Sequence, residues 1–573
     1  MSEQILSPGV FQNESDQSLV QQGTPATATA IVGPTVKGLP LVPTYITSYT
    51  QYQSQFGETF KSGSYYYEYL TSIAAREFFN NGGQTLIITR VISGSAGVSN
   101  FASSSIPAQT GSVASFALEA LAWGDVMNNT SSLVSGSLSS GSAMNIRWEI
   151  TNVSTGSGIF NLAIRLGNDN DTQKNYIESW PNLSLDPNLP NYISRVIGDT
   201  KSVYTIDASG NPFIYTSGSY SNNSQFVRVS SVPAPQVDSI DNNGNYKAGQ
   251  YSGSLPLLGS GSYGGSFNGG LPATTMVQLM NENITTTNIQ GYSVTDYQNA
   301  INILANRDEY KINVILAPGL GLDSAGSVTL VSLAQTRGDV FAPVDAGVFG
   351  IVVNQAVTNA SGNSSNYAAA YYPWVQMYNS NLGKAVWCPP STIMGGVLAF
   401  NDKVGQPWFA PAGINRGGVP SVVKAERKLS QTDRDTLYAA NVNPIATFPG
   451  EGVVVYGQKT LQRKSTALDR VNVRRLLLAL KDFIGGVSRG LVFEQNTNVT
   501  RNKFLGQVNP YLDMVVQKSG LYAYKVVMDD TNNTADVIDR NQLVGQIYIQ
   551  PTKTAEFIIL NFNILPTGAQ FPA

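Results

Sequence analysis

The residues that most often carry enzyme chemistry are scarce in this chain. Its 573 residues include no histidine and a single cysteine, Cys388. Ser-His-Asp and Cys-His catalysis, His-ligated metals and histidine pH switches are therefore excluded, and no disulfide can form within the chain. Carboxylate, lysine and tyrosine catalysis remain open, but no pair of carboxylates stands out. The sequence predicts a protein that is not an enzyme and that has no cofactor or metal.

Two short motifs resemble ligand-binding loops but lack the required surroundings. Gly259, Gly261 and Gly264 match GxGxxG, yet more Gly, Ser and Asn flank them instead of a strand and a helix. A flexible loop is the better interpretation. Residues 529–534 (DDTNNT) lack the spacing and the closing Glu of a calcium loop, so they predict a turn between strands.

One cluster of positive charge lies between residues 459 and 489, where only Asp469 and Asp482 oppose it. A solvated helix face with internal salt bridges explains it, and so does a basic surface that meets an acidic protein partner. Nucleic acid is disfavoured, since no aromatic residues are interleaved and the net charge is −3. The cluster comprises Lys459, Arg463, Lys464, Arg470, Arg474, Arg475, Lys481 and Arg489.

The composition is low in charge and rich in small residues. Charged residues make up 13% of the chain, against about 25% in an ordinary globular domain. The length predicts several domains. The start, MSEQILSPGV, has neither a basic region nor an apolar stretch, so we expect no secretory signal. No apolar run reaches the roughly 18 to 20 residues of a membrane span, so we expect no membrane insertion.

The elements that carry these residues change character along the chain. Residues 1–24 are expected to form an extended arm, and a strand (26–32), a helix (65–81) and a strand (85–92) follow. Low-complexity Gly/Ser segments then separate short β-like runs between residues 95 and 284. From residue 285, helices and strands alternate again. These changes predict a β-rich insertion into an α/β protein.

The C-terminal part shows the most regular pattern. A helix capped by Asp469 is expected to end at Gly485 and Gly486, and a second helical stretch is expected between 497 and 518, where Pro510 could restart it. Strands are expected over 521–528, 543–550 and 555–564. A long terminal strand exposes unpaired backbone groups unless another chain pairs with it. Self-assembly is therefore the first functional hypothesis.

Ten segments carry a recognisable pattern in a fixed order. They are LSPGV (6–10), AAREFFNNGG with ITRVI (74–92), ILAPG (315–319), AAYYPWV (369–375), CPPSTIMGGVLAF (388–400), APAGINRGG (410–418), NPI (443–445), VVVYGQKTL (453–461), DRVNVRRLLLALK (469–481) and DVIDRNQLVGQIYIQPTKTAEFIILNF (536–562). Together they closely resemble the tail sheath proteins of contractile-tailed bacteriophages (myovirus type). The resemblance covers residues 1–94 and 285–573.

The resemblance implies an α+β multidomain fold. Its α/β sheath core would be built from both chain ends, with an inserted β-rich outer domain. Residues 1–24 plus 420–573 would form the inner domain with exchanged terminal arms, residues 25–94 plus 285–419 the middle domain, and residues 95–284 the variable outer domain.

The resemblance also implies a structural role. Sheath subunits form hexameric rings stacked helically around a tail tube, and they contract to drive the tube through the host envelope. The implied partners are other copies, the tail tube protein, and baseplate and tail terminator proteins. The implied place is the virion tail, after assembly in the host cytoplasm.

The residues implied for these contacts fall in two sets. Strand exchange between subunits is expected at Val10, Leu19, Val20, Ile547, Ile549, Phe557, Ile558, Leu560 and Phe562. Tube-facing charge is expected at Arg474, Arg475, Lys481, Arg501 and Lys503. The first two arginines could equally be buried scaffolding for their helix, and the sequence leaves that open.

Two other functions remain open at this point. The chain could be the sheath of a phage-derived contractile injection particle, which neighbouring genes would distinguish from a phage tail. Alternatively, residues 95–284 could make it a carbohydrate-binding or adhesive β-protein.

Overall fold

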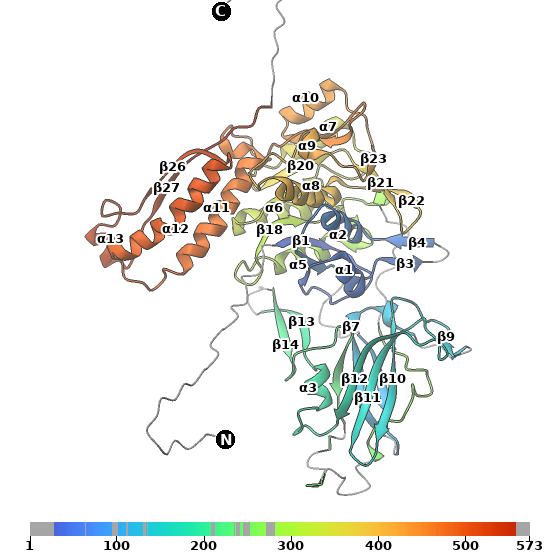
Figure 1. Ribbon diagram of the computed structural model, residues 1–573. Coiled ribbons are helices and arrows are strands. Elements are labelled where there is room, and N and C mark those ends of the chain that lie inside the picture. The colour runs from blue at the N-terminus through green and yellow to red at the C-terminus, as the bar shows by residue number, and fades with distance from the viewer. Residues whose placement is uncertain are drawn as a thin grey trace, which may run out of the picture.

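Figure 1 shows a computed structural model of the chain, which describes residues 28–62, 65–93, 101–110, 113–129, 133–134, 136–207, 212–233, 235–236, 241–243, 253–270 and 281–556. Buried apolar side chains form three groups, and these divide the described residues into three regions. The largest lies in a central α/β region, and the second fills a β-rich region below it in the figure. The third joins two long helices to a β-hairpin.

A mostly parallel sheet forms the centre of the molecule. A bridge between Val314 and Phe341 joins its two halves into one surface. The inner strands are buried on both faces, as continuous apolar runs require when helices cover a parallel sheet. Across the sheet the strands are β2 (Thr44–Ile46), β5 (Leu86–Arg90), β1 (Ala28–Gly33), β18 (Ile312–Leu316), β19 (Ala342–Asp345), β20 (Ala368–Tyr372), β24 (Val442–Phe448) and β25 (Gly452–Val455).

Helices cover this sheet, and their ends follow local sequence signals. Ser293 and Ser430 each form a capping box with the aspartate three residues later. Pro390 stands in the first turn of its helix, where its missing N–H costs nothing. The helices are α1 (Tyr49–Phe56), α2 (Leu70–Asn80), α5 (Val294–Ile303), α6 (Ala325–Arg337), α7 (Val353–Ser361), α8 (Pro390–Val404), α9 (Ile414–Gly417) and α10 (Gln431–Ala439).

Smaller strand groups surround the sheet. They are the pairs β3 (Thr59–Ser62) with β4 (Tyr65–Glu68) and β16 (Asn288–Ile289) with β17 (Tyr292–Ser293), and the set β22 (Lys384–Cys388), β21 (Val375–Asn379) and β23 (Val422–Ala425). Residues 65–68 are therefore a strand, and the helix expected over 65–81 begins only at Leu70.

The β-rich region has its own core between Ala102 and Phe267. Two buried arginines, Arg147 and Arg165, both donate to Asp169 inside it. Its main elements are β6 (Phe101–Pro107), β7 (Ala114–Trp123), β10 (Ile146–Ser154), β11 (Ile159–Leu166), β12 (Tyr176–Ser184), α3 (Ile193–Ile197) and β15 (Val227–Ser231), with short pairs β8 (Leu133–Val134) with β9 (Ser137–Leu138) and β13 (Lys201–Ile206) with β14 (Pro212–Ser217).

The third region, here called the C-terminal unit, is a helical hairpin covered by a β-hairpin. It comprises α11 (Val471–Arg489), α12 (Asn498–Gln517), β26 (Leu521–Val527), α13 (Ala535–Asp539) and β27 (Gln546–Pro551). α11 does not end at Gly485 and Gly486 as expected, since it continues to Arg489. α12 likewise runs through Pro510 without restarting. The residue before α11 is Arg470, so the expected cap at Asp469 belongs to a short 3-10 turn instead.

The expected boundary of the inner domain at residue 420 does not fit the packing. β23 pairs with β21 and β24 with β20, and Val442 and Ile445 belong to the largest apolar group. Residues 420–461 are therefore part of the central region, since their strands complete its sheets. The C-terminal unit begins close to residue 462.

No helix in the described part of the chain is both long and apolar enough to cross a membrane.

Candidate assembly interface

The β-hairpin of the C-terminal unit has unpaired edges. β26 and β27 pair antiparallel, with Tyr524 opposite Ile549 and Val526 opposite Ile547. Within the described residues this sheet has only these two strands, so each strand keeps one edge without a partner. Such an edge presents unpaired N–H and C=O groups to another strand. The hairpin can accept a further strand on either side.

One face of this hairpin rests on the two helices. Val526, Ile547 and Ile549 pack against the apolar group of the C-terminal unit. The helices contribute Leu476, Leu480, Phe504, Val508, Leu512 and Val515, all buried. On β26 and β27, Tyr522 and Tyr548 remain exposed. This packing holds the hairpin flat on its helices while both edges stay accessible.

After β27 the chain crosses back to the central region and is anchored there. The carboxylate of Glu556 accepts hydrogen bonds from Arg470 Nε at 2.7 Å, Tyr438 Oη at 2.8 Å and Gln458 Nε2 at 3.1 Å. Gln458 Nε2 also donates to Thr554 Oγ1 at 2.6 Å. We call Tyr438, Gln458 and Arg470 the tail clamp.

Ionisation of Glu556 reflects two opposing effects. Burial disfavours its charged form, but the hydrogen bonds from the tail clamp and the charge of Arg470 outweigh burial. The pKa of Glu556 is therefore lowered from its usual value of 4.5. The clamp holds a carboxylate, and it fixes the position of Glu556, the last residue that the structure describes.

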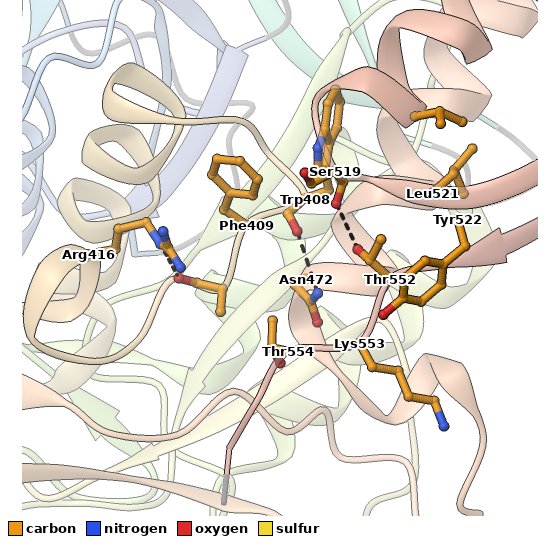
Figure 2. A pocket seen from close by; sticks show the side chains of 12 residues that line it. Trp408, Phe409, Arg416, Asn472, Ser519, Leu521, Tyr522, Thr552, Lys553 and Thr554 are labelled. Atoms are coloured by element: carbon orange, nitrogen blue, oxygen red, sulfur yellow. Dashed lines mark hydrogen bonds between the residues drawn. The ribbon is translucent and has the colours of Figure 1, made fainter. Parts of the chain in front are cut away.

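An open pocket of about 480 Å³ lies where the C-terminal unit meets the central region (Figure 2). We call it the base pocket. It is lined by residues 408–410 and 416, Asn472 in the first turn of α11, residues 516, 519, 521 and 522, and residues 552–554. The indole N–H of Trp408 donates to the Lys518 carbonyl at 3.0 Å. The Thr552 hydroxyl donates to the Ser519 carbonyl at 2.8 Å. These bonds fix the walls of the pocket.

Four of the five basic residues expected on a tube-facing surface have hydrogen-bond partners within the chain, and three of these four are buried. The guanidinium of Arg475 donates to both carboxylate oxygens of Asp402, at 2.8 and 2.6 Å. Arg474 lies over the ring of Tyr367 and donates to the Asn366 carbonyl at 3.0 Å. Both are buried. The scaffolding alternative accounts for their contacts.

The remaining three residues of that set comprise one buried arginine and two exposed lysines. Arg501 is buried and pairs with Asp530 and the Asn496 side chain. Lys481 and Lys503 are exposed on the two helices, although Lys481 Nζ also donates to the Gly338 carbonyl at 3.2 Å. Exposed positive charge on this unit is therefore sparser than the sequence suggests.

The residues expected to exchange strands are only partly within the described chain. Ile547 and Ile549 lie on β27 and pack against the helices, so they attach the β-hairpin to α11 and α12. The other expected residues, Val10, Leu19, Val20, Phe557, Ile558, Leu560 and Phe562, lie outside the described residues. Of the third terminal strand (555–564), only Ala555 and Glu556 are described, and neither is in a strand.

The two rejected ligand motifs lie in turns. Gly261 and Gly264 have positive φ angles within a run of turns. Asp529 accepts from the backbone N–H and hydroxyl of Thr531, which closes the turn before α13. Among the described residues no group of three or more Cys, Asp or Glu side chains is arranged to hold a metal ion.

The sequence did not reveal the tail clamp or the base pocket. Both join segments about a hundred residues apart, such as Gln458 with Glu556 and Trp408 with Lys518. The one available signal was Glu556, a lone acid at the start of an apolar run. An acid at that place indicates a buried or paired carboxylate, but it does not name the partner.

Two known protein domains match this chain, one over part of the central region and one over the C-terminal unit. Residues 290–461 match the phage tail sheath protein central domain, and residues 463–565 match the phage tail sheath C-terminal domain. The chain is therefore similar to both sheath domains. The junction between the two matches coincides with the start of the C-terminal unit, so this unit is the part that resembles the sheath C-terminal domain. The resemblance to tail sheath proteins of contractile-tailed phages is confirmed.

Curated relatives point to the same family. The chain is 38% identical over 217 residues to the tail sheath protein of Vibrio phage KVP40, covering 38% of this chain and 32% of that protein. It is 36% identical over 298 residues to the tail sheath protein of Enterobacteria phage T4, covering 48% of this chain and 45% of that protein. The matches thus span less than half the length of either relative.

A solved structure shows that the fold is shared over nearly the whole chain. A sheath tail protein from Listeria innocua superposes with a TM-score of 0.53 and covers 92% of this chain and 95% of its own. Its sequence is only 10% identical, so the likeness concerns the fold alone. An α+β multidomain fold is thereby supported.

Proposed function

We propose that this chain is the subunit of a contractile phage tail sheath, which polymerises around a tail tube and contracts to drive the tube through the host envelope. The observation that carries the proposal is the pairing of two sheath-family domains with a C-terminal hairpin whose edges are unpaired. Its place would be the virion tail, assembled in the host cytoplasm. Its work would be mechanical rather than enzymatic.

The hairpin β26–β27 is the proposed acceptor of strands from neighbouring copies. An added strand would form roughly four to six backbone hydrogen bonds, each contributing about 1 kcal/mol net. The N-terminal arm (1–24) and residues 557–573 are the proposed donors. Because the tail clamp holds Glu556, each copy would send its C-terminal segment out from a fixed point.

The other partners follow from the same proposal. The C-terminal unit would face the tail tube, and of the five basic residues expected there, Lys481 and Lys503 are the exposed ones. The β-rich region would be the inserted outer domain, away from the tube. Baseplate and tail terminator proteins would contact the ends of the helical stack of hexameric rings.

Sedimentation of purified protein tests the strand-exchange part of the proposal. The full chain should pellet as polymer, whereas chains lacking residues 1–20 or 557–573 should remain in the supernatant. Circular dichroism and thermal unfolding serve as the folding control, because the deletions leave every described element intact. Normal polymerisation by both deletion variants would contradict strand exchange.

A further inference from the structure

The tip of the helical hairpin displays an aromatic side chain to solvent. Between α11 and α12, Leu491 is buried, but Val492 is 61% exposed and Phe493 is fully exposed. Phe493 has a φ angle of 71°, a conformation that bulky residues rarely adopt. Such an outlier persists only where the surrounding structure enforces it, and it favours a functional interpretation.

Backbone hydrogen bonds hold this tip in place. The N–H of Val492 donates to the Arg489 carbonyl, and the N–H of Glu494 donates to the Leu491 carbonyl at 3.1 Å. The phenyl ring therefore projects from a closed turn. We call Val492 and Phe493 the hairpin tip. An exposed aromatic side chain on an ordered turn is the kind of anchor that fills a pocket on a partner.

The same chain offers a pocket of suitable size, lined by both apolar and polar residues, at the other end of the helical hairpin. Trp408, Phe409 and Leu521 contribute rings and methyl groups to the base pocket (Figure 2). Its volume of about 480 Å³ accommodates an aromatic side chain with a neighbouring aliphatic one. The pocket is open to solvent, so an occupant can enter from outside.

One polar atom in the base pocket lacks a partner. Asn472 is 3% exposed, and its side-chain oxygen accepts no hydrogen bond, while its amide donates to the Trp408 carbonyl at 3.5 Å. A buried acceptor without a donor costs free energy. The wall of the base pocket therefore contains an unsatisfied acceptor at Asn472.

The tip and the pocket cannot meet within one molecule. Asn472 lies in the first turn of α11, and Phe493 follows its last turn. The helix has 19 residues and is therefore about 28 Å long.

The charges beside the two features are opposite, since Glu494 is exposed next to the tip and Lys553 is exposed at the pocket. A second copy can place its hairpin tip in the pocket and its Glu494 close to Lys553.

We propose that the hairpin tip of one copy inserts Phe493 into the base pocket of another copy. This contact deepens the proposed sheath function and depends on it. It is head-to-tail, because tip and pocket are different surfaces, and a head-to-tail contact can repeat along a helical assembly. It would set the spacing between successive C-terminal units, independently of the exchanged strands.

Disulfide trapping tests this contact directly. Cys388 is fully buried, so introduced cysteines react without interference. Val492→Cys, which keeps the Phe493 ring, and Thr554→Cys variants are mixed under assembly conditions and oxidised. Only the mixture, and not either variant alone, should give a linked species of twice the chain mass.

Absence of the linked species overturns the contact, whether or not tubes form. If wild-type protein forms tubes in the same buffer, the sheath proposal survives that failure; if it forms none, the sheath proposal fails separately. If Thr554→Cys links instead to Phe11→Cys, the occupant is the N-terminal arm, which also overturns the tip contact.

A second variant measures the contribution of the phenyl ring. Phe493→Ala should raise the concentration needed for polymerisation by roughly tenfold or more, the effect of removing a central aromatic anchor. Its thermal unfolding should not change, because the ring is fully exposed in the single chain. Tyr65→Ala, which removes another exposed ring, is the matched control. Unchanged polymerisation by Phe493→Ala would also overturn the proposal.

Discussion

At the residue scale, charge in this molecule serves internal packing more than the sequence suggests. Arg475 and Arg501 are buried and form ion pairs with Asp402 and Asp530. Buried guanidinium groups need such partners, because an uncompensated charge in the interior is costly. A count of basic residues along α11 therefore overstates the charge available to another protein.

The ion pair between Arg475 and Asp402 links α11 to α8, so its loss should loosen the C-terminal unit. We expect Arg475→Ala to lower the free energy of unfolding by about 1–3 kcal/mol, since a buried charged hydrogen-bond pair is lost. Thermal unfolding checks this value. Arg489→Ala, on the exposed end of the same helix, is the matched control and should have little effect.

The tail clamp should respond to acid. The pKa of Glu556 is lowered in the folded chain, so its contribution is complete above 4.5 and is lost as the pH falls through the lowered value. A dye on Ala555→Cys should gain rotational freedom in that range, as fluorescence anisotropy would show. Glu556→Gln should abolish the acid transition. An unchanged transition in that variant would assign it to another group.

At the scale of elements, the helices and strands of the C-terminal unit follow from sequence patterns, but their ends do not. The apolar stripe of α11 and the strands at β26 and β27 are predicted correctly, since amphipathic periodicity is a local property. Gly485 and Gly486 do not end α11, because packing against α12 overrides the weak helix propensity of glycine. The tail clamp depends on distant segments, and no local pattern encodes it.

The two glycines of α11 offer a test at this scale. A Cβ atom at Gly485 or Gly486 would meet no atom within 4 Å. Replacing both with alanine should therefore stabilise the C-terminal unit by roughly 1–2 kcal/mol through reduced chain entropy. Chemical denaturation measures the change. Gly83→Ala is the contrasting control, because its Cβ would lie 2.1 Å from the Phe78 ring.

At the scale of the whole molecule, the division into regions follows buried side chains rather than sequence texture. The change in texture near residue 95 corresponds to a separate β-rich core. The boundary at residue 420 does not hold, since β24 completes a sheet begun by strands far earlier in the chain. Pairing between distant parallel strands cannot be read from either strand alone.

The whole molecule combines a central region with a C-terminal unit that we propose contacts other copies. Its unpaired hairpin edges, the clamped tail and the hairpin tip all belong to that unit. In the proposed sheath, strand addition at these edges would keep the subunits joined while they move. The central claim is therefore that this chain forms a tubular helical polymer.

Negative-stain electron microscopy of the purified full-length protein tests that claim most directly. The expected result is hollow tubes of uniform diameter with a regular repeat along their length. Single particles of one chain, persisting at every concentration and salt condition tried, would contradict it.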